Sequence, residues 1–170
     1  MEILKMATEW AKAEVFSTRF FIFFAVLFLI ASIGFWQLGK ADIAKAYIIP
    51  MLVAGSLLMI IGLGLFFTNK ARITQFQAAY HQDATAFLTS EIARAESTLK
   101  EYQTVVFKAI PIIIIVAALL IVFIETPAWR AAAITTIAMM IVILLIDGTA
   151  HARIEGYYKQ LQSVDKHRDY

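Results

Sequence analysis

The feature that most constrains this chain is a set of four long apolar stretches without a charged residue, at 20–38, 46–68, 109–124 and 131–146. A helix needs about 20 residues to cross the ~30 Å hydrocarbon core of a bilayer, so the two shorter stretches need help from their flanks. In lipid the backbone must satisfy its own hydrogen bonds, which runs of this length achieve only as helices. The sequence therefore predicts four transmembrane helices.

The composition excludes several other classes of protein. Hydrophobic residues make up 61% of the chain and charged residues only 16%, whereas an ordinary soluble domain has roughly 45–50% and about 25%. A disordered chain would instead have few hydrophobic residues and many charged ones. The absence of cysteine excludes disulfides, a cysteine nucleophile and thiolate metal sites. A net charge of +2 is too small to indicate nucleic acid as a partner.

The distribution of basic residues predicts the orientation. Twelve of the 15 Lys and Arg residues lie in the N-terminal segment, the central loop and the C-terminal tail, and only Lys40, Lys45 and Arg130 lie in the outer turns. The more basic side is cytoplasmic in most membrane proteins. We expect an all-α, four-transmembrane-helix antiparallel bundle with helical cytoplasmic extensions. It would be a multi-pass protein of the bacterial cytoplasmic (inner) membrane, with both termini inside.

The predicted segments follow from this placement. They are an N-terminal amphipathic helix (1–19), a first transmembrane hairpin (20–68), a cytoplasmic helical hairpin (69–108), a second transmembrane hairpin (109–146) and a juxtamembrane helix and tail (147–170). The central segment contains no Gly or Pro and must bend, because a 40-residue rod would extend about 60 Å without returning. Asp83, Thr85 and the 89–91 run are candidate N-caps. Beyond the bend, a coiled-coil-like seam comprises Leu88, Ile92, Ala95, Leu99, Tyr102 and Val106.

Two short segments suggest a tandem duplication of a two-span hairpin. Ala71-Arg72-Ile73-Thr74-Gln75-Phe76 follows the second apolar stretch, and Ala152-Arg153-Ile154-Glu155-Gly156-Tyr157 follows the fourth. Halving the chain places the joint near residue 85, within the predicted bend. A chance resemblance between two membrane flanks is the alternative, and both interpretations remain open.

The apolar stretches offer packing surfaces but no ionisable group. The absence of charged residues and histidine there disfavours a proton-coupled transporter and a haem site. Gly55 and Gly62 lie seven residues apart on one helix face, which we expect to pack closely against a neighbour. We expect Pro111 to occupy the first turn of the third transmembrane helix, where its missing N–H costs nothing.

One group of side chains could carry chemistry. Asp147, His151 and Glu155 recur every four residues and share a helix face just beyond the fourth stretch. Such a face could bind a divalent metal, although an ordinary solvated face has the same pattern. Depth in the membrane also predicts an ion pair between Lys108 and Asp147.

The function expected from the sequence is non-enzymatic. The chain would act as a scaffold, accessory subunit or partner-recognition protein through its cytoplasmic helices, in contact with the bilayer and with another protein or a second copy. No catalytic, cofactor or metal residue is assigned. Expected contact residues, which mix basic and aromatic types, are Arg72, Phe76, Tyr80, Phe87, Arg153, Tyr157 and Tyr158.

Two other functions remain open from the sequence. The first is a small oligomeric channel or facilitator, in which Ser56, Thr135 and Thr136 would converge on a water-filled axis. The second is a membrane enzyme that uses Asp147, His151 and Glu155 as a juxtamembrane metal site.

Overall fold

The chain folds into four long helices. The computed structural model describes residues 2–168, so Met1 and residues 169–170, which the predicted end segments include, lie outside the described part. The elements are α1 (Glu2–Leu38), α2 (Asp42–Ala46), α3 (Ile48–Gln82), α4 (Ala84–Glu101), the π-helix η1 (Tyr102–Ala109), α5 (Ile110–Phe123) and α6 (Pro127–Arg168). All regular structure in residues 2–168 is helical, as predicted. Four of the helices are long and apolar enough to cross a membrane.

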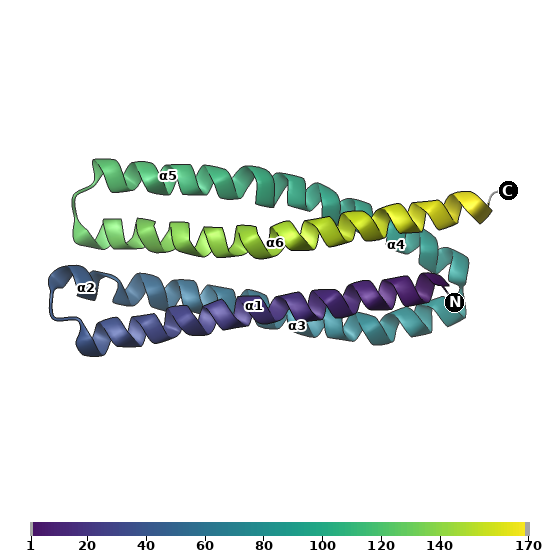
Figure 1. Ribbon diagram of the computed structural model, residues 1–170, viewed down its shortest axis with the longest axis horizontal. Helices are drawn as coiled ribbons and strands as arrows, with labels where there is room; N and C mark the ends of the chain where they lie inside the picture. Colours follow the sequence, from purple (N-terminus) through teal and green to yellow (C-terminus); the bar gives the residue numbers. More distant parts are fainter. Residues whose placement is uncertain (1, 169–170) are drawn as a thin grey trace.

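The long helices run side by side. Figure 1 shows α1 beside α3 and α5 beside α6, with both short connections at one end and both termini at the other. Helix α6 packs against α1, α3, α4 and α5. Gly55 and Gly62 of α3 lie against α1, where an added Cβ would come within 2.8 Å of Leu29 Cγ and 2.9 Å of Phe21 Cβ. The close packing expected of this glycine face is therefore confirmed.

The central segment bends at Asp83. Its backbone is extended (φ −156°, ψ 105°) between α3 and α4, and its Oδ1 accepts hydrogen bonds from the backbone N–H groups of Thr85 (2.8 Å) and Ala86 (3.0 Å). An N-cap aspartate satisfies donors that the first helical turn leaves free. One of the three predicted positions for the bend, Asp83, is thus confirmed.

Pro111 lies in the first turn of α5, as predicted, but α5 is not a separate helix, so the expectation that the missing N–H falls at a free helix start is wrong. Elements α4, η1 and α5 form one continuous helix, Ala84–Phe123, and Pro111 lies inside it, just after the π-helical segment. A proline inside a helix removes one backbone hydrogen bond and its ring clashes with the carbonyl four residues earlier, here that of Phe107. Phe107 lies within η1, so the wider π-helical turn accommodates the proline.

The molecule has two hydrophobic cores, one in each half of its length. We call residues 2–15, 69–104 and 147–168 the head, and residues 16–68 and 105–146 the apolar half. The core of the head includes Trp10, Phe76, Phe87, Ile154 and Tyr157. The core of the apolar half comprises Phe21, Ala25, Phe28, Ala54, Leu58, Met139, Val142 and Ile146. Helix α6 contributes to both cores and ties the halves together.

The surface is divided along the same line. Every exposed large hydrophobic side chain of the described residues lies in the apolar half, between Phe16 and Phe67 or between Val105 and Leu145. Examples are Ile60 (68% exposed) and Val122 (73% exposed). The head buries or half-buries its large apolar side chains, whereas the apolar half has an apolar exterior. This is the distribution expected of a chain that enters lipid.

Candidate functional site: a polar cavity between the two cores

A cavity of about 330 Å³ lies where the head meets the apolar half. Its walls come from α1, α3, α4, η1 and α6. Its large apolar lining residues include Phe21, Leu65, Val106 and Ile146 of the apolar half, and all of its charged lining residues belong to the head. The polar and charged side chains are Trp10, Glu14, Ser17, Thr18, Asn69, Arg72, Arg94, Thr98, Glu101, Tyr102 and Asp147. The cavity therefore joins an apolar surface to a charged one.

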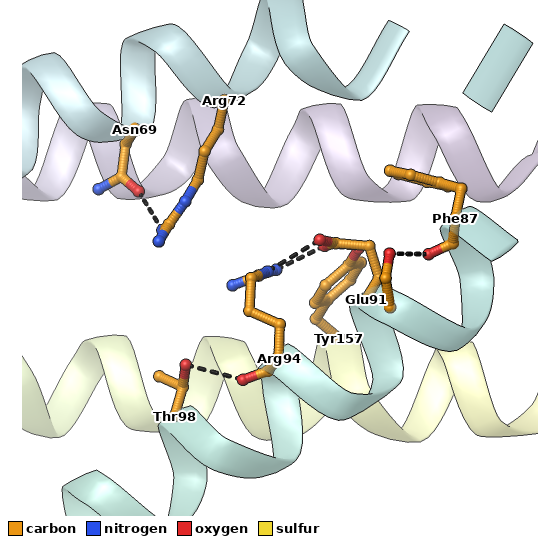
Figure 2. A network of polar contacts seen from close by, with 8 residues as sticks. Asn69, Arg72, Phe87, Glu91, Arg94, Thr98 and Tyr157 are labelled. Carbon is orange, nitrogen blue, oxygen red and sulfur yellow. Dashed lines mark hydrogen bonds and ion pairs between the residues drawn. The ribbon is translucent and has the colours of Figure 1, made fainter. Parts of the chain in front are cut away.

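A buried ion pair within α4 forms one wall. Arg94 donates to both carboxylate oxygens of Glu91, from Nε (2.9 Å) and Nη2 (2.6 Å), and the Tyr157 hydroxyl of α6 donates to Glu91 Oε2 at 2.8 Å (Figure 2). The two charged side chains are three residues apart, a spacing that brings them to one helix face. Because Glu91 is only 4% exposed, Arg94 and Tyr157 are what allow it to be buried.

This network shifts the pKa values of its members. Burial lowers the pKa of Arg94, but the hydrogen bonds and charge of Glu91 outweigh burial and leave the pKa raised. Burial, followed by the charge of Glu91, raises the pKa of Tyr157 well above its ordinary value. The arginine is therefore held as a cation and the tyrosine as a neutral donor.

Trp10 of α1 contacts two side chains of this network. The Arg94 guanidinium carbon lies 4.3 Å from the centre of the Trp10 ring, and the Tyr157 ring stacks on Trp10 with centroids 5.4 Å apart and planes 13° apart. A cation over an indole face is stabilised by the ring quadrupole. Trp10 thus joins α1 to α4 and α6 at the cavity wall.

Arg72 of α3 contrasts with Arg94. Its Nη1 donates to Asn69 Oδ1 at 2.9 Å, and Figure 2 shows it extending towards the same space as Arg94. Within residues 2–168, no carboxylate lies within the 4.0 Å of an ion pair with it. Burial, and then the like charge of Arg94, lowers its pKa, against the smaller opposing effects of the Glu91 and Glu14 charges. Arg72 is thus a half-buried cation that feels these carboxylates but forms an ion pair with neither.

Arg153 of α6, which holds the place of Arg72 in the similar six-residue segment, does have a carboxylate partner. Its Nε donates to Glu14 Oε1 of α1 at 3.1 Å. Its Nη2 is buried and finds no hydrogen-bond acceptor in the described part of the chain, and the same holds for the Trp10 Nε1 donor. Of these two residues, Trp10 lines the cavity, whereas Arg153 lines a separate, more open pocket.

Asp147 contributes an unpaired, half-buried carboxylate, whereas the other unpaired carboxylate of the lining, Glu101, is exposed. It lies one residue beyond the fourth apolar stretch and lines the cavity. Burial, with a smaller contribution from Glu14, raises its pKa to about 6. The expected ion pair with Lys108 does not form, because no basic group of the described residues lies within 4.0 Å of the Asp147 carboxylate. Lys108 is exposed on η1, whereas Asp147 faces the interior.

The three residues considered for a metal site have separate environments. His151 packs edge-on against the rings of Tyr102 and Phe107, and Glu155 pairs with Lys159 at 2.6 Å. No group of three or more His, Asp or Glu side chains within residues 2–168 is arranged to hold a metal ion. Of the hydroxyl residues considered for a channel, Ser56 is exposed, Thr136 is half-buried and Thr135 is 2% exposed.

The seven expected contact residues occupy different environments. Phe76, Phe87 and Tyr157 are buried in the head core, and Tyr80 and Tyr158 pack against it while keeping part of their surface. Arg72 lines the cavity, and Arg153 is half-buried beside Glu14. The structure therefore brings most of the set into one region, largely inside the head.

Sequence reasoning missed the residues that shape the cavity, namely Trp10, Glu14, Asn69, Glu91 and Arg94. One signal was readable, because Glu91 lies between the seam residues Leu88 and Ala95 at helical spacing. A charge at such a position predicts a buried partner. That the partners are Arg94 and Tyr157, from two different helices, could not be read from spacing.

The cavity can act as a binding site for a small polar group. It has an unpaired guanidinium, a half-buried unpaired carboxylate and the unused Trp10 Nε1 donor, on a rigid helical frame. Its volume is at the lower end of the roughly 300–1,000 Å³ typical of small-molecule sites. The chain matches no protein-family model, no curated protein and no solved structure.

Proposed function

We propose that the apolar half crosses a bilayer as an antiparallel four-helix bundle, with the head and both termini in the cytoplasm. The observation that carries this placement is the confinement of exposed large hydrophobic side chains to the apolar half. In water so large an apolar exterior would drive aggregation, whereas in lipid it carries no penalty. The excess of Lys and Arg on the head side supports the cytoplasmic orientation.

We further propose that the protein is a non-enzymatic accessory or scaffold protein that contacts another protein through the head. A helical domain with its own core and a buried ion-pair network, held just outside the membrane, offers a rigid surface for recognition. Tyr80 and Tyr158 are the expected contact residues of this surface, because they are aromatic and keep part of their area exposed.

Site-specific photo-crosslinking in the native membrane tests this function. A photoreactive side chain at Ser97 or Gln160, both exposed on the head, should give one discrete adduct with a different protein. The same side chain at Lys40, in the outer turn, is the matched control and should not. Tyr158→Ala should lower the adduct yield several-fold. If the head crosslinked only to lipid, or only to a second copy of the chain, the result would contradict the proposal.

A further inference from the structure

Three charged side chains that line the cavity have no ion pair in the described residues, namely Arg72, Asp147 and Glu101, and of these only Glu101 is exposed. In the Glu91–Arg94 pair and in the Glu14–Arg153 pair, each charge is neutralised by its partner. Arg72 and Asp147, which both line the cavity, then remain without an oppositely charged side chain within 4.0 Å anywhere in the described residues. Half-buried charges of this kind are costly unless something neutralises them. A ligand that carries both charges would complement both residues.

The position of the cavity restricts the source of such a ligand. The cavity lies at the junction of the head and the apolar half, where the polar headgroups of a bilayer would be. Two apolar residues of its lining are exposed on the outside of the molecule, Leu65 of α3 (40%) and Val105 of η1 (54%). A lipid could place its headgroup in the cavity and keep its acyl chains along this apolar rim.

The helix geometry at the cavity points to the same place. Three lining residues, Tyr102, Val105 and Val106, belong to the π-helix η1. π-helical segments within α-helices are rare and occur frequently at functional sites. Here the wider turn carries the rim residue Val105.

The two similar segments add an independent comparison. Arg72 and Arg153 hold the same place in the two matching six-residue segments. Arg153 is neutralised by Glu14 of the chain itself, whereas Arg72 has the amide of Asn69 and the Trp10 ring, 5.9 Å from its guanidinium carbon, but no carboxylate in an ion pair. Because Asn69 Oδ1 accepts from Arg72, the amide NH₂ of Asn69 is left to donate elsewhere. Arg72 thus lacks the carboxylate partner that Arg153 has.

We propose that the cavity binds the headgroup of a zwitterionic phospholipid that carries a primary ammonium group, such as phosphatidylethanolamine. Arg72 and the Asn69 amide hold the phosphate, and Asp147 accepts hydrogen bonds from the ammonium. A guanidinium presents paired N–H groups that match two phosphate oxygens. A primary ammonium carries three N–H donors for a carboxylate.

Other headgroups complement the cavity less well. An anionic phosphatidylglycerol would satisfy Arg72 but leave Asp147 facing a second negative charge. A choline headgroup has a quaternary nitrogen with no N–H to donate. A water-soluble headgroup would gain nothing from the apolar rim at Leu65 and Val105. These three ligands are therefore the comparison set for the experiment.

The experiment uses full-length protein purified in mild detergent, stripped of lipid and analysed by native mass spectrometry. The probes are phosphatidylethanolamine, phosphatidylcholine and phosphatidylglycerol with identical acyl chains, and free glycerophosphoethanolamine. We expect about tenfold preference for phosphatidylethanolamine over the other two lipids and no retention of the soluble headgroup. Equal binding of the three lipids, preference for the anionic lipid, or binding of the soluble headgroup alone would each overturn the proposal.

Variants assign the two charges. Arg72→Gln should lower the affinity for phosphatidylethanolamine about tenfold, and Asp147→Asn should abolish the preference over phosphatidylcholine. Lys70→Gln, which removes an exposed charge from the same helix, is the matched control and should leave binding unchanged. If Arg72→Gln does not fold, the loss or survival of selectivity in Asp147→Asn decides the question. Unchanged selectivity in Asp147→Asn would overturn the proposal.

The inference rests on the proposed membrane insertion, and the same material separates the two. Reconstitution of the protein into lipid nanodiscs reports insertion without reference to headgroup selectivity. Incorporation into nanodiscs without selectivity would reject only the headgroup site. Failure to incorporate at all would reject the membrane placement itself.

Discussion

At the scale of single residues, the Glu91 carboxylate is the most constrained group in the head. It accepts hydrogen bonds from two helices, α4 and α6, through Arg94 and Tyr157. Arg94 in turn stacks on Trp10 of α1. One buried charge therefore determines how three helices meet. Burying an ion pair contributes little net stability, but removal of one partner leaves the other charge buried and uncompensated.

Glu91→Ala should therefore destabilise the protein by about 3–5 kcal/mol, because Arg94 would remain buried without a counterion. Thermal unfolding in detergent, followed by circular dichroism, measures the change. Glu96→Ala is the matched control, since Glu96 pairs with Lys100 on the exposed side of the same helix, where such pairs contribute less than about 1 kcal/mol. Similar melting temperatures for the two variants would contradict the role given to Glu91.

Asp147 predicts a pH dependence. Its pKa of about 6 lies above the ordinary value of 3.8, so the folded state holds this proton more tightly than the unfolded state does. Its contribution to stability is therefore greatest below about pH 4 and is lost as the pH rises towards 6. In lipid-free detergent, Asp147→Asn should be more stable than wild type at pH 7.5, by on the order of 2–3 kcal/mol.

The stabilisation by Asp147→Asn should vanish near pH 4, where the wild-type carboxyl group is protonated as well. Asp165→Asn, which removes an exposed carboxylate from the same helix, controls for the general effect of charge and should not change the pH profile. If the stability of Asp147→Asn depended on pH in the same way as that of the wild type, burial of this carboxylate would have no energetic cost.

At the scale of elements, the packing of α3 on α1 depends on small residues. The backbone of α3 comes so close to α1 at Gly62 that an added Cβ would meet Phe21 Cβ at 2.9 Å and Ile22 N at 3.1 Å. Gly64, two residues along the same helix, has nothing within 4 Å of the equivalent position. The two glycines therefore have the same helix propensity but different surroundings.

Gly62→Ala should lower stability by about 1–3 kcal/mol, because α1 and α3 must separate to admit the methyl group. Gly64→Ala should be neutral or slightly stabilising, since alanine favours a helix more than glycine does. Thermal melting of both variants in the same detergent makes the comparison. Equal effects of the two substitutions would contradict close contact between α1 and α3 at Gly62.

At the scale of the whole molecule, the helical plan was predictable from the sequence and the cavity was not. The helical class, the bend at Asp83 and the close-packed face of Gly55 and Gly62 follow from local rules on length, capping and side-chain size. The contacts of Glu91 with Tyr157, and of Glu14 with Arg153, join residues far apart in the chain. No periodicity encodes such contacts, because they depend on how four helices are rotated about their axes.

Pro111 illustrates the same limit. Its missing N–H is compatible either with the start of a helix or with an interior position that its neighbours accommodate. The structure has the second arrangement, with η1 directly upstream. The choice depends on how the continuous helix Ala84–Phe123 packs against α6. The residues next to Pro111 in the sequence carry no information on that packing.

The measurement that tests the central claim most directly is cysteine accessibility in intact cells, read on the purified protein, which has no cysteine of its own to contribute background. Lys40→Cys lies in the outer turn and Ser163→Cys in the head, and both positions are exposed. We predict that a membrane-impermeant maleimide labels Lys40→Cys in intact cells and Ser163→Cys only after permeabilisation. Labelling of Ser163→Cys from outside, or recovery of the protein in the soluble fraction, would contradict the account.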